Sequence, residues 1–217
     1  MKYLYLLLLL FSSTYAYSSY NTGAKNEGWV TKDGKPAPNT NNMKSINSKQ
    51  YKTTNWSGGQ TTELFIFPNS CVFKNLDFQY RISIATIQVS SSDFTPLPDV
   101  SRTLLLLEGE LKLIHENHHE SFLMPFSQDS FQGGWKTQSI GIAKDFNLMT
   151  RQGCSSTIEV ITNKVSMDYD FDHLLIYNFD GSCNINEASL LQNDLMVFSE
   201  TLSDSISIDI DGHIVLV

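Results

Sequence analysis

The spacing of apolar residues constrains this chain most. From about residue 51 onward, short runs rich in Ile, Leu, Phe, Val and Thr are separated roughly every ten residues by Asn, Asp, Gly, Ser or Pro. This spacing is typical of an all-β sandwich or barrel, and no segment has the sustained 3.6-residue apolar period of an amphipathic helix. Of the 217 residues, 41% are hydrophobic and 18% are charged, which excludes a disordered or fibrous protein.

The apolar runs predict a series of strands, although the assignment of any single run stays open. The predicted strands are 61–67, 78–89, 101–108, 111–115, 120–124, 136–143, 145–150, 156–165, 173–179, 195–199, 205–210 and 213–217. Asp211-Gly212, between the last two, predicts a hairpin turn.

Two stretches, 104–131 and 173–200, repeat the same order of strand, Gly turn, hairpin and short apolar run with an acidic turn. Gly181 in the second takes the position of Gly109 in the first, and Asn193-Asp194 that of Gln128-Asp129. Two such units predict a cupin-type double β-barrel, a bicupin.

The N-terminus has the layout of a secretory signal peptide. Lys2 precedes an unbroken apolar run over residues 3–11, and the small residues Thr14 and Ala16 follow it. We expect residues 1–16 to be removed by cleavage after Ala16, and the mature protein to be periplasmic or secreted. A retained anchor is the alternative, but the run is far shorter than the ~20 residues that a membrane-spanning helix needs.

Residues 17–50 are rich in Asn, Ser, Thr, Gly and Pro and almost lack aliphatic side chains. They predict a polar, largely disordered leader in front of one barrel domain at residues 51–217. The formal net charge is −8, and the chain has no run of basic residues. Nucleic acid and, after signal cleavage, membrane surfaces are therefore not expected as partners.

The chain has three cysteines, Cys71, Cys154 and Cys183, and is predicted to enter an oxidising compartment. At most one internal disulfide can form, and three pairings stay open. At least one thiol is then free or paired with a second copy of the chain, which leaves a homodimer open. No CxxC motif and no Cys/His cluster with zinc spacing occurs, so we predict no cofactor and no structural metal.

Polar residues recur at a two-residue spacing within three of the predicted strands. Successive strand side chains point to opposite faces, so each set leaves its strand on one side and the intervening apolar residues pack on the other. The sets are Thr61 and Glu63; Arg81, Ser83 and Ala85; and Asp145, Asn147, Met149 and Arg151.

If these sets face a barrel lumen, they form a pocket with Arg and Asn donors, carboxylate acceptors and a Met wall. Such a pocket suits a small anion, because the planar guanidinium of Arg can hold a carboxylate by two parallel hydrogen bonds. The alternative is that the sets lie on solvent-exposed strand faces, with Glu63–Arg81 or Asp145–Arg151 as surface ion pairs of little energetic value.

The segment HENHHE, residues 115–120, partly resembles the first metal motif of cupins, in which two His at alternate positions and a Glu bind iron, manganese or nickel. Asn117 stands where the second His should be, and His118 and His119 fall at the predicted hairpin turn, where histidines are usually solvated. We therefore predict no metal site. We also assign no catalytic residue, because no GxSxG elbow occurs and no cysteine has a basic partner nearby in sequence.

Five segments that recur in one order resemble the HutD/Ves family. They are NWSGGQTTE from Asn55, FQYRISIA from Phe78, DFTPLPDVSR from Asp93, LEG from Leu107 and KDFNLMTR from Lys144. The match spans about residues 50–200, and its specificity lies in the shared order, since each segment alone is weak.

The resemblance implies a cupin-type double β-barrel without the usual metal ligands and with no established catalytic activity. Members similar to this chain are associated with histidine utilisation, where a regulatory role through binding urocanate or a related small carboxylate has been proposed, or with stress response. The family motifs fall on Thr61 and Glu63; on Arg81, Ser83 and Ala85; on Asp145, Asn147 and Met149; and on Phe94, Pro98 and Arg102.

The chain departs from the family at three places. Pro98-Asp99 stands where the family tends to have a Pro-Gly turn, and a longer loop with Cys71 separates the first two motifs. The third is the leader, because sequences of family members generally indicate cytosolic proteins. A secreted family member cannot regulate a cytosolic pathway by binding the repressor of that pathway. The resemblance therefore transfers the ligand pocket but not the physiological role.

Our first hypothesis is a non-enzymatic protein that binds a small carboxylate or imidazole-bearing ligand, whose anionic end Arg81 and Arg102 would hold. The residues assigned to this ligand are Trp56, Thr61, Glu63, Arg81, Ser83, Arg102, Asp145, Asn147 and Met149. One alternative is a metal-dependent cupin enzyme, a dioxygenase or isomerase, that uses His115, His118 or His119 with Glu120. Another is an envelope or host-interaction scaffold.

Overall fold

A computed structural model describes residues 43–151, 153–167, 172–186, 188–199 and 205–217. These residues form strands and two short 3₁₀ helices, η2 (Ser48–Gln50) and η3 (Phe73–Asn75), with no α-helix among them, which confirms the all-β prediction. No helix in the described ranges has the length and apolar character needed to cross a membrane. The predicted signal peptide and leader residues 17–42 lie outside the described residues.

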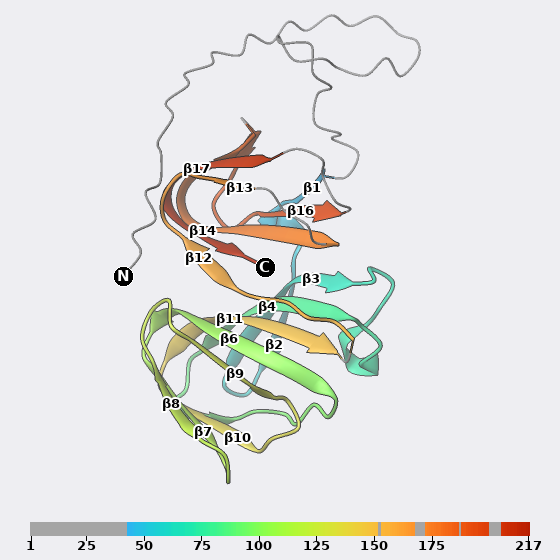
Figure 1. Cartoon of the computed structure of the whole chain (residues 1–217). Coiled ribbons are helices and arrows are strands. Elements are labelled where there is room, and N and C mark those ends of the chain that lie inside the picture. Colours follow the sequence, from blue (N-terminus) through green and yellow to red (C-terminus); the bar gives the residue numbers. More distant parts are fainter. Residues whose placement is uncertain (1–42, 152, 168–171, 187, 200–204) are drawn as a thin grey trace, which may run out of the picture. The chain divides into compact units, whose positions relative to one another are not determined.

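The first barrel consists of two antiparallel sheets (Figure 1). The six-stranded sheet has the order β2 (Lys52–Trp56), β3 (Gly59–Phe67), β4 (Tyr80–Ile87), β11 (Ala143–Arg151), β6 (Val100–Gly109) and β9 (Gln128–Gln132). The four-stranded sheet has the order β5 (Ser91–Asp93), β10 (Thr137–Ile140), β7 (Leu111–His115) and β8 (Glu120–Leu123).

The second barrel is built from one seven-stranded sheet. Its main path is β1 (Met43–Ile46), β16 (Leu195–Ser199), β14 (His173–Ile185), β17 (Ile206–Leu216) and β12 (Glu159–Ile161). In addition, β13 (Val165–Met167) pairs with β17, and β15 (Ala188–Leu190) pairs with β14. The two barrels together confirm the predicted double barrel.

The repeat between the halves is confirmed at its glycines and corrected at its turn. Gly109 pairs with Ala143 and Gly181 with Gly212, each at a crossing of two backbones. In the first half, Phe126 donates to the carbonyl of Leu106 and has a left-handed φ of 66°. In the second half, Asn193 donates to the carbonyl of Asn178, also with a φ of 66°. Asn193-Asp194 therefore corresponds to Phe126-Ser127, two residues before the predicted partner.

Two predictions place the boundaries between strands wrongly. Asp211-Gly212 does not form a hairpin turn but lies inside the continuous strand β17, because both residues pair with β14. The predicted strand 156–165 is instead two short strands, β12 and β13, which pair with separate parts of β17. Both errors come from pairing partners that are distant in sequence.

The predicted leader also extends too far toward the barrel. Residues 43–46 form β1, which pairs with β16, and η2 follows directly. The carboxylate of Asp194, a buried residue, accepts hydrogen bonds from the Ser48 backbone N–H (2.7 Å) and from Nδ2 of Asn47 (3.0 Å). The folded unit therefore begins by Met43, not at residue 51, and the leader prediction is wrong for residues 43–50.

The main hydrophobic core lies between the two barrels. It combines one face of the six-stranded sheet, including Leu105, Phe146 and Leu148, with Leu175 and Tyr177 of β14. The Phe146 and Tyr177 rings lie 5.8 Å apart, and both residues are almost fully buried. The opposite face of the six-stranded sheet, which faces the interior of the first barrel, carries the polar sets.

Candidate functional site

The register of the six-stranded sheet brings the predicted residues into adjacent cross-strand rows. One row joins Ile66, Arg81, Met149, Arg102 and Phe131 across β3, β4, β11, β6 and β9. The next joins Glu63, Ser83, Asn147, Leu104 and Asp129 across the same strands. A third contains Thr61, Ala85, Asp145 and Leu106. Directly paired side chains leave a sheet on the same face, so the rows form one polar surface.

This polar surface is buried inside the first barrel. The relative exposure is 5% for Arg81, 7% for Arg102, 1% for Asp145 and 4% for Asn147. The neighbouring Leu104 and Phe131 belong to the barrel's internal hydrophobic cluster. The alternative that these strand faces are solvent-exposed is therefore wrong.

Arg81 is held by several partners. Its Nε donates to Oε2 of Glu63 at 2.7 Å, and its Nη1 donates to Oγ of Ser83 at 3.0 Å. The guanidinium carbon lies 4.1 Å from the centre of the Phe73 ring. The Glu63–Arg81 pair, which the sequence analysis considered only as a surface pair, thus forms but is largely buried. The other pair considered there does not form, because Arg151 donates to the Leu76 carbonyl.

Arg102 lacks such partners. Its guanidinium lies over the rings of Phe94 (4.6 Å) and Phe131 (5.2 Å), and its buried Nε makes no hydrogen bond. Among the described residues, no carboxylate lies within ion-pair distance of Arg102. Burial lowers the pKa of Arg102 to about 10, opposed by Asp145 and reinforced by Arg81. The residue remains a cation at neutral pH.

Asp145 and Asn147 add unpaired acceptors to the same surface. Oδ1 of Asp145 and Oδ1 of Asn147 are buried and have no hydrogen-bond partner in the described part of the chain. Burial raises the pKa of Asp145 to about 7, while Arg102 and a hydrogen bond from Asn147 oppose this rise. A buried polar atom left without a partner costs about 1–3 kcal/mol. Arg102, Asp145 and Asn147 could therefore gain partners from a polar guest.

One of the predicted residues stands apart from this group. Trp56 pairs with Gly59 and packs beside Gly58, and Gly59 pairs with Ile87 at the opposite end of β4 from Arg81. Thr61 is half-buried and shares the third row with Asp145. The structure brings eight predicted residues together on the polar surface: Thr61, Glu63, Arg81, Ser83, Arg102, Asp145, Asn147 and Met149.

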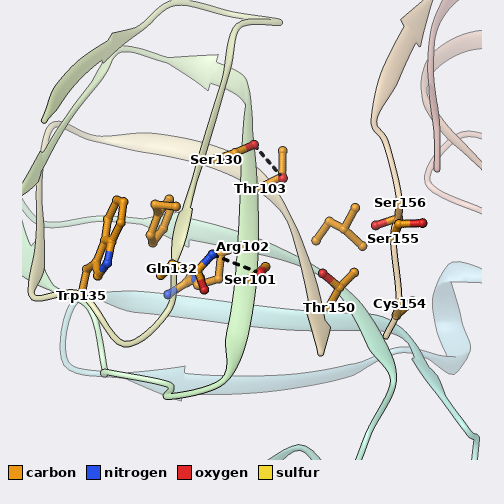
Figure 2. Close-up of a pocket in the computed structure, with 12 residues that line it drawn as sticks. Ser101, Arg102, Thr103, Ser130, Gln132, Trp135, Thr150, Cys154, Ser155 and Ser156 are labelled. Atoms are coloured by element: carbon orange, nitrogen blue, oxygen red, sulfur yellow. Dashed lines mark hydrogen bonds between the residues drawn. The ribbon is translucent and has the colours of Figure 1, made fainter. Parts of the chain in front are cut away.

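A groove of about 390 Å³ lies along β6, β9 and β11 (Figure 2). Arg102, Gln132 and Trp135 lie on one side of it, and the segment from Cys154 to Ser156 lies on the other. The groove is rich in hydroxyl groups, from Ser101, Thr103, Ser130, Thr150, Ser155 and Ser156. Arg102 is the only residue of the predicted set that lines it.

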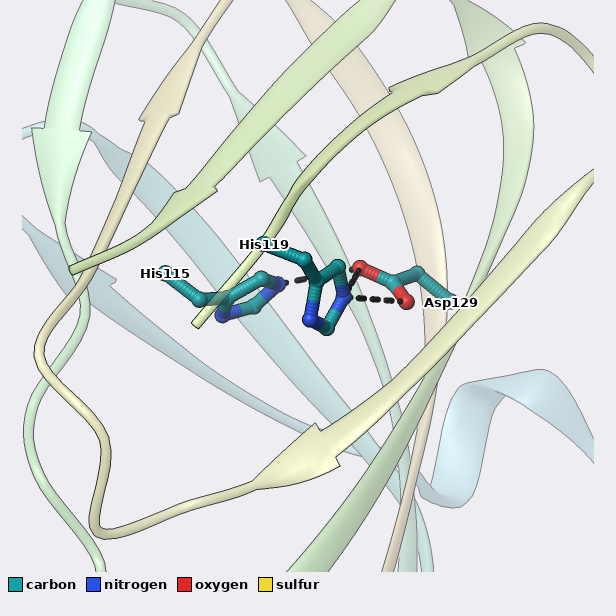
Figure 3. Close-up of side chains that lie close together, drawn as sticks. All are labelled: His115, His119 and Asp129. Carbon is teal, nitrogen blue, oxygen red and sulfur yellow. Dashed lines mark hydrogen bonds and ion pairs between the residues drawn. The ribbon is translucent and has the colours of Figure 1, made fainter. Parts of the chain in front are cut away.

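A His/Asp cluster lies where the β7–β8 turn meets β9 (Figure 3), and it combines two histidines that the sequence analysis considered for the alternative metal enzyme with Asp129, which it did not consider. Nε2 of His115 lies 2.9 Å from Oδ2 of Asp129, and Nε2 of His119 lies 3.1 Å from Oδ1 of Asp129. His119 was expected to be solvated at the turn, but its side chain turns to Asp129. His118, by contrast, is exposed and stacks on Trp135 with 3.7 Å between ring centres.

A sequence signal for the histidine pair existed in the hairpin itself. The backbone N–H of His115 donates to the carbonyl of His119, so these residues are partners across the turn between β7 and β8. Asn117 takes a left-handed φ of 64° there, a conformation that Asn tolerates better than most residues. Asn117 thus closes the turn that brings His119 beside His115. Asp129 reaches the two histidines only because the barrel brings β9 next to the β7–β8 turn, and no residue pattern around Asp129 indicates this contact.

The three cysteine thiols are free, so no pairing among Cys71, Cys154 and Cys183 is present. Cys183 is buried in the second barrel, and burial raises its pKa to about 11.

Comparisons with known proteins agree with this architecture. The family model described as HutD matches residues 48–216. HutD from Pseudomonas fluorescens SBW25, solved in a formate condition, has a TM-score of 0.69 and 19% identity over 80% of this chain and 96% of that chain. A conserved protein of unknown function from Pseudomonas aeruginosa PAO1 has a TM-score of 0.68 and 17% identity over the same shares.

A more distant likeness extends to YhhW from Escherichia coli. It has a TM-score of 0.62 and 11% identity over 80% of this chain and 96% of that chain. No curated protein sequence matches this chain. At such identities, the similarity to solved structures shows a shared fold.

Proposed function

The chain belongs to the HutD family, and on that premise we propose that its first barrel binds a small carboxylate whose anionic end is held by Arg102. The observation that carries this proposal is a buried guanidinium with an unpartnered Nε and no carboxylate within ion-pair distance among the described residues. A carboxylate supplies the missing charge and an acceptor for Nε. Charge-assisted hydrogen bonds of this kind are stronger than neutral ones.

Neighbouring residues suit the rest of such a ligand. Arg81, already neutralised by Glu63, adds donors without adding net charge. Oδ1 of Asn147 and Oδ1 of Asp145 are free to accept from an N–H or O–H group of the guest. A ligand with a carboxylate and a polar N–H fits this combination. Because the family is associated with histidine utilisation, urocanate and histidine are the first acids to test, with formate and formylglutamate beside them.

The experiment is calorimetric titration of the full chain with each of these acids, supported by thermal shifts. We expect one acid to bind, and Arg102→Gln and Asn147→Ala each to weaken binding, the former by about 10- to 100-fold because a charged hydrogen bond contributes about 1.5–3 kcal/mol. Lys112→Gln is the matched control, since it removes one positive charge from an ion pair on the same barrel. Equal weakening by Lys112→Gln, or no binding of any acid, contradicts the proposal.

We also propose that the protein is exported and that it binds its ligand in the periplasm or outside the cell. The support is the basic residue, apolar run and small-residue site of the first 16 residues. The mass of the protein isolated from its native cells tests this directly. A mature chain that begins at Tyr17 is expected, and a chain that retains residues 1–16 contradicts export by this route.

A further inference from the structure

Three side chains with metal-binding atoms converge beside the β7–β8 turn. His115 ends β7, His119 lies across the turn from it, and Asp129 comes from β9 of the facing sheet. Figure 3 shows the two imidazole rings next to the carboxylate. Their ligand atoms all lie within 4.8 Å of one another.

The spacing of these atoms fits a single metal ion. Nε2 of His119 is 3.1 and 3.2 Å from the two oxygens of Asp129, and Nε2 of His115 is 2.9 Å from Oδ2. Ligands held at about 2.0–2.2 Å from one ion lie roughly 3 Å apart in a tetrahedral or octahedral shell. The distances from each nitrogen to the carboxylate therefore suit one shared ion, and all three residues offer ligand atoms within 4.8 Å of one another.

The other nitrogen of His115 is already positioned for this role. Nδ1 of His115 lies 2.8 Å from Oγ1 of Thr137, and that hydroxyl can donate to the carbonyl of Trp135 at 3.4 Å. In that arrangement, Nδ1 donates to Thr137, and Nε2 is the nitrogen left for an ion, which would take the place of the proton that lies between Nε2 and Oδ2 of Asp129 in the metal-free chain. Metal-binding histidines commonly have such a partner on the second nitrogen, because it fixes the tautomer and the ring orientation.

Burial and charge favour a cation as the guest. The side chain of His115 is fully buried, that of Asp129 is 11% exposed, and that of His119 is 38% exposed. His119 therefore provides access from solvent. Phe131 and Trp135 flank His115 with apolar rings at 4.4 and 5.8 Å, which strengthens the attraction between an ion and its ligands. Two neutral imidazoles and one carboxylate leave a net negative charge.

From these observations we propose that His115, His119 and Asp129 bind one divalent transition-metal ion. Imidazole ligands suit zinc, nickel, copper and iron, whereas magnesium and calcium prefer shells of oxygen. Three protein ligands leave at least one coordination position for water or another small ligand. The arrangement differs from the alternate-His pattern considered from the sequence, because the second imidazole comes from across the turn and the acid from β9.

The experiment is titration of the untagged, chelator-treated full chain with ZnCl₂, NiCl₂ and MgCl₂ in separate calorimetric runs. We expect binding of zinc or nickel at one ion per chain and none of magnesium. A cobalt(II)-loaded sample gives an independent readout, since its visible absorption reports nitrogen and oxygen coordination. No binding of zinc or nickel overturns the proposal.

Variants from the same turn sharpen the test. His119→Ala and Asp129→Asn are expected to weaken binding at least 10-fold and to change the cobalt spectrum, whereas the matched control His118→Ala keeps both. Circular dichroism establishes that each variant is folded, and partly exposed His119 keeps the test valid if Asp129→Asn does not fold. Equal weakening by His118→Ala and His119→Ala overturns the assignment. The Arg102→Gln variant is expected to keep metal binding, which separates this site from the carboxylate site.

Discussion

Buried charges inside the first barrel differ in how well each one is balanced. Arg81 has Glu63 and Ser83 as hydrogen-bond partners, and its charge is matched by a carboxylate 2.7 Å away. Asp145 is almost fully buried, and one of its oxygens has no hydrogen-bond partner. Burial therefore makes ionisation of Asp145 less favourable in the folded chain than in water and raises its pKa, even with Arg102 nearby.

Asp145 should consequently make stability depend on pH. Its pKa is raised from 3.8 to about 7 in the folded chain, so the group contributes no penalty below about pH 4. As the pH rises, the unfolded chain ionises first, and stability falls until the pH passes about 7. The full penalty is ~4 kcal/mol. We expect Asp145→Asn to gain stability relative to the wild type between about pH 4 and pH 8 in urea unfolding. A pH-independent difference contradicts this explanation.

At the level of elements, the two halves reach the same geometry with different strands. In the first barrel, β6 and β7 are separate, as are β10 and β11, whereas β14 and β17 run through the corresponding places without a break. Gly181 and Gly212 make the continuous strands cross closely, and a Cβ built on Gly181 would lie 1.9 Å from the Asp211 carbonyl oxygen. An Asp-Gly pair is favoured both in a hairpin turn and at such a close crossing, so the residues Asp211-Gly212 alone do not distinguish the two.

The crossing predicts different costs for two glycines that both have positive φ. Gly181 has a φ of 78° and a crowded Cβ position, whereas Gly153 has a φ of 89° and no atom within 4 Å of its Cβ position. Gly153→Ala should cost about 1 kcal/mol through backbone strain alone. Gly181→Ala should cost about 1–3 kcal/mol more, because the backbone at Asp211 and Gly212 must also move. Chemical denaturation of both variants measures the difference, and equal losses would show that the crossing can relax.

For the whole molecule, the core between the barrels decides whether the halves unfold together. Phe146 contributes to that core from the first barrel and Tyr177 from the second, and both are almost fully buried. Phe126, from a first-barrel loop, also stacks on His213 of β17 at 4.3 Å between ring centres. Neither barrel can separate without exposing this shared surface, so the domain is expected to behave as one cooperative unit.

Unfolding curves test this cooperativity. We expect circular dichroism and tryptophan fluorescence to give coincident transitions, and Phe146→Ala to lower the free energy of unfolding by about 3–5 kcal/mol. Phe122→Ala is the control, since Phe122 is 76% exposed on β8 and its loss should change stability by less than about 0.5 kcal/mol. Two separated transitions in the wild type would show that the barrels unfold independently.

The sequence by itself determined the all-β class, the repeat of two barrels and the set of residues on one polar strand face. These properties follow from alternation over a few neighbouring residues and from the order of motifs, which a single chain displays directly. Only the tertiary structure decided that this polar face points inward, that residues 43–46 complete the second barrel, and that Asp129 meets His115 and His119. Each of these depends on sheet pairing or packing between segments far apart in sequence. A local residue pattern does not show which distant segment it will contact.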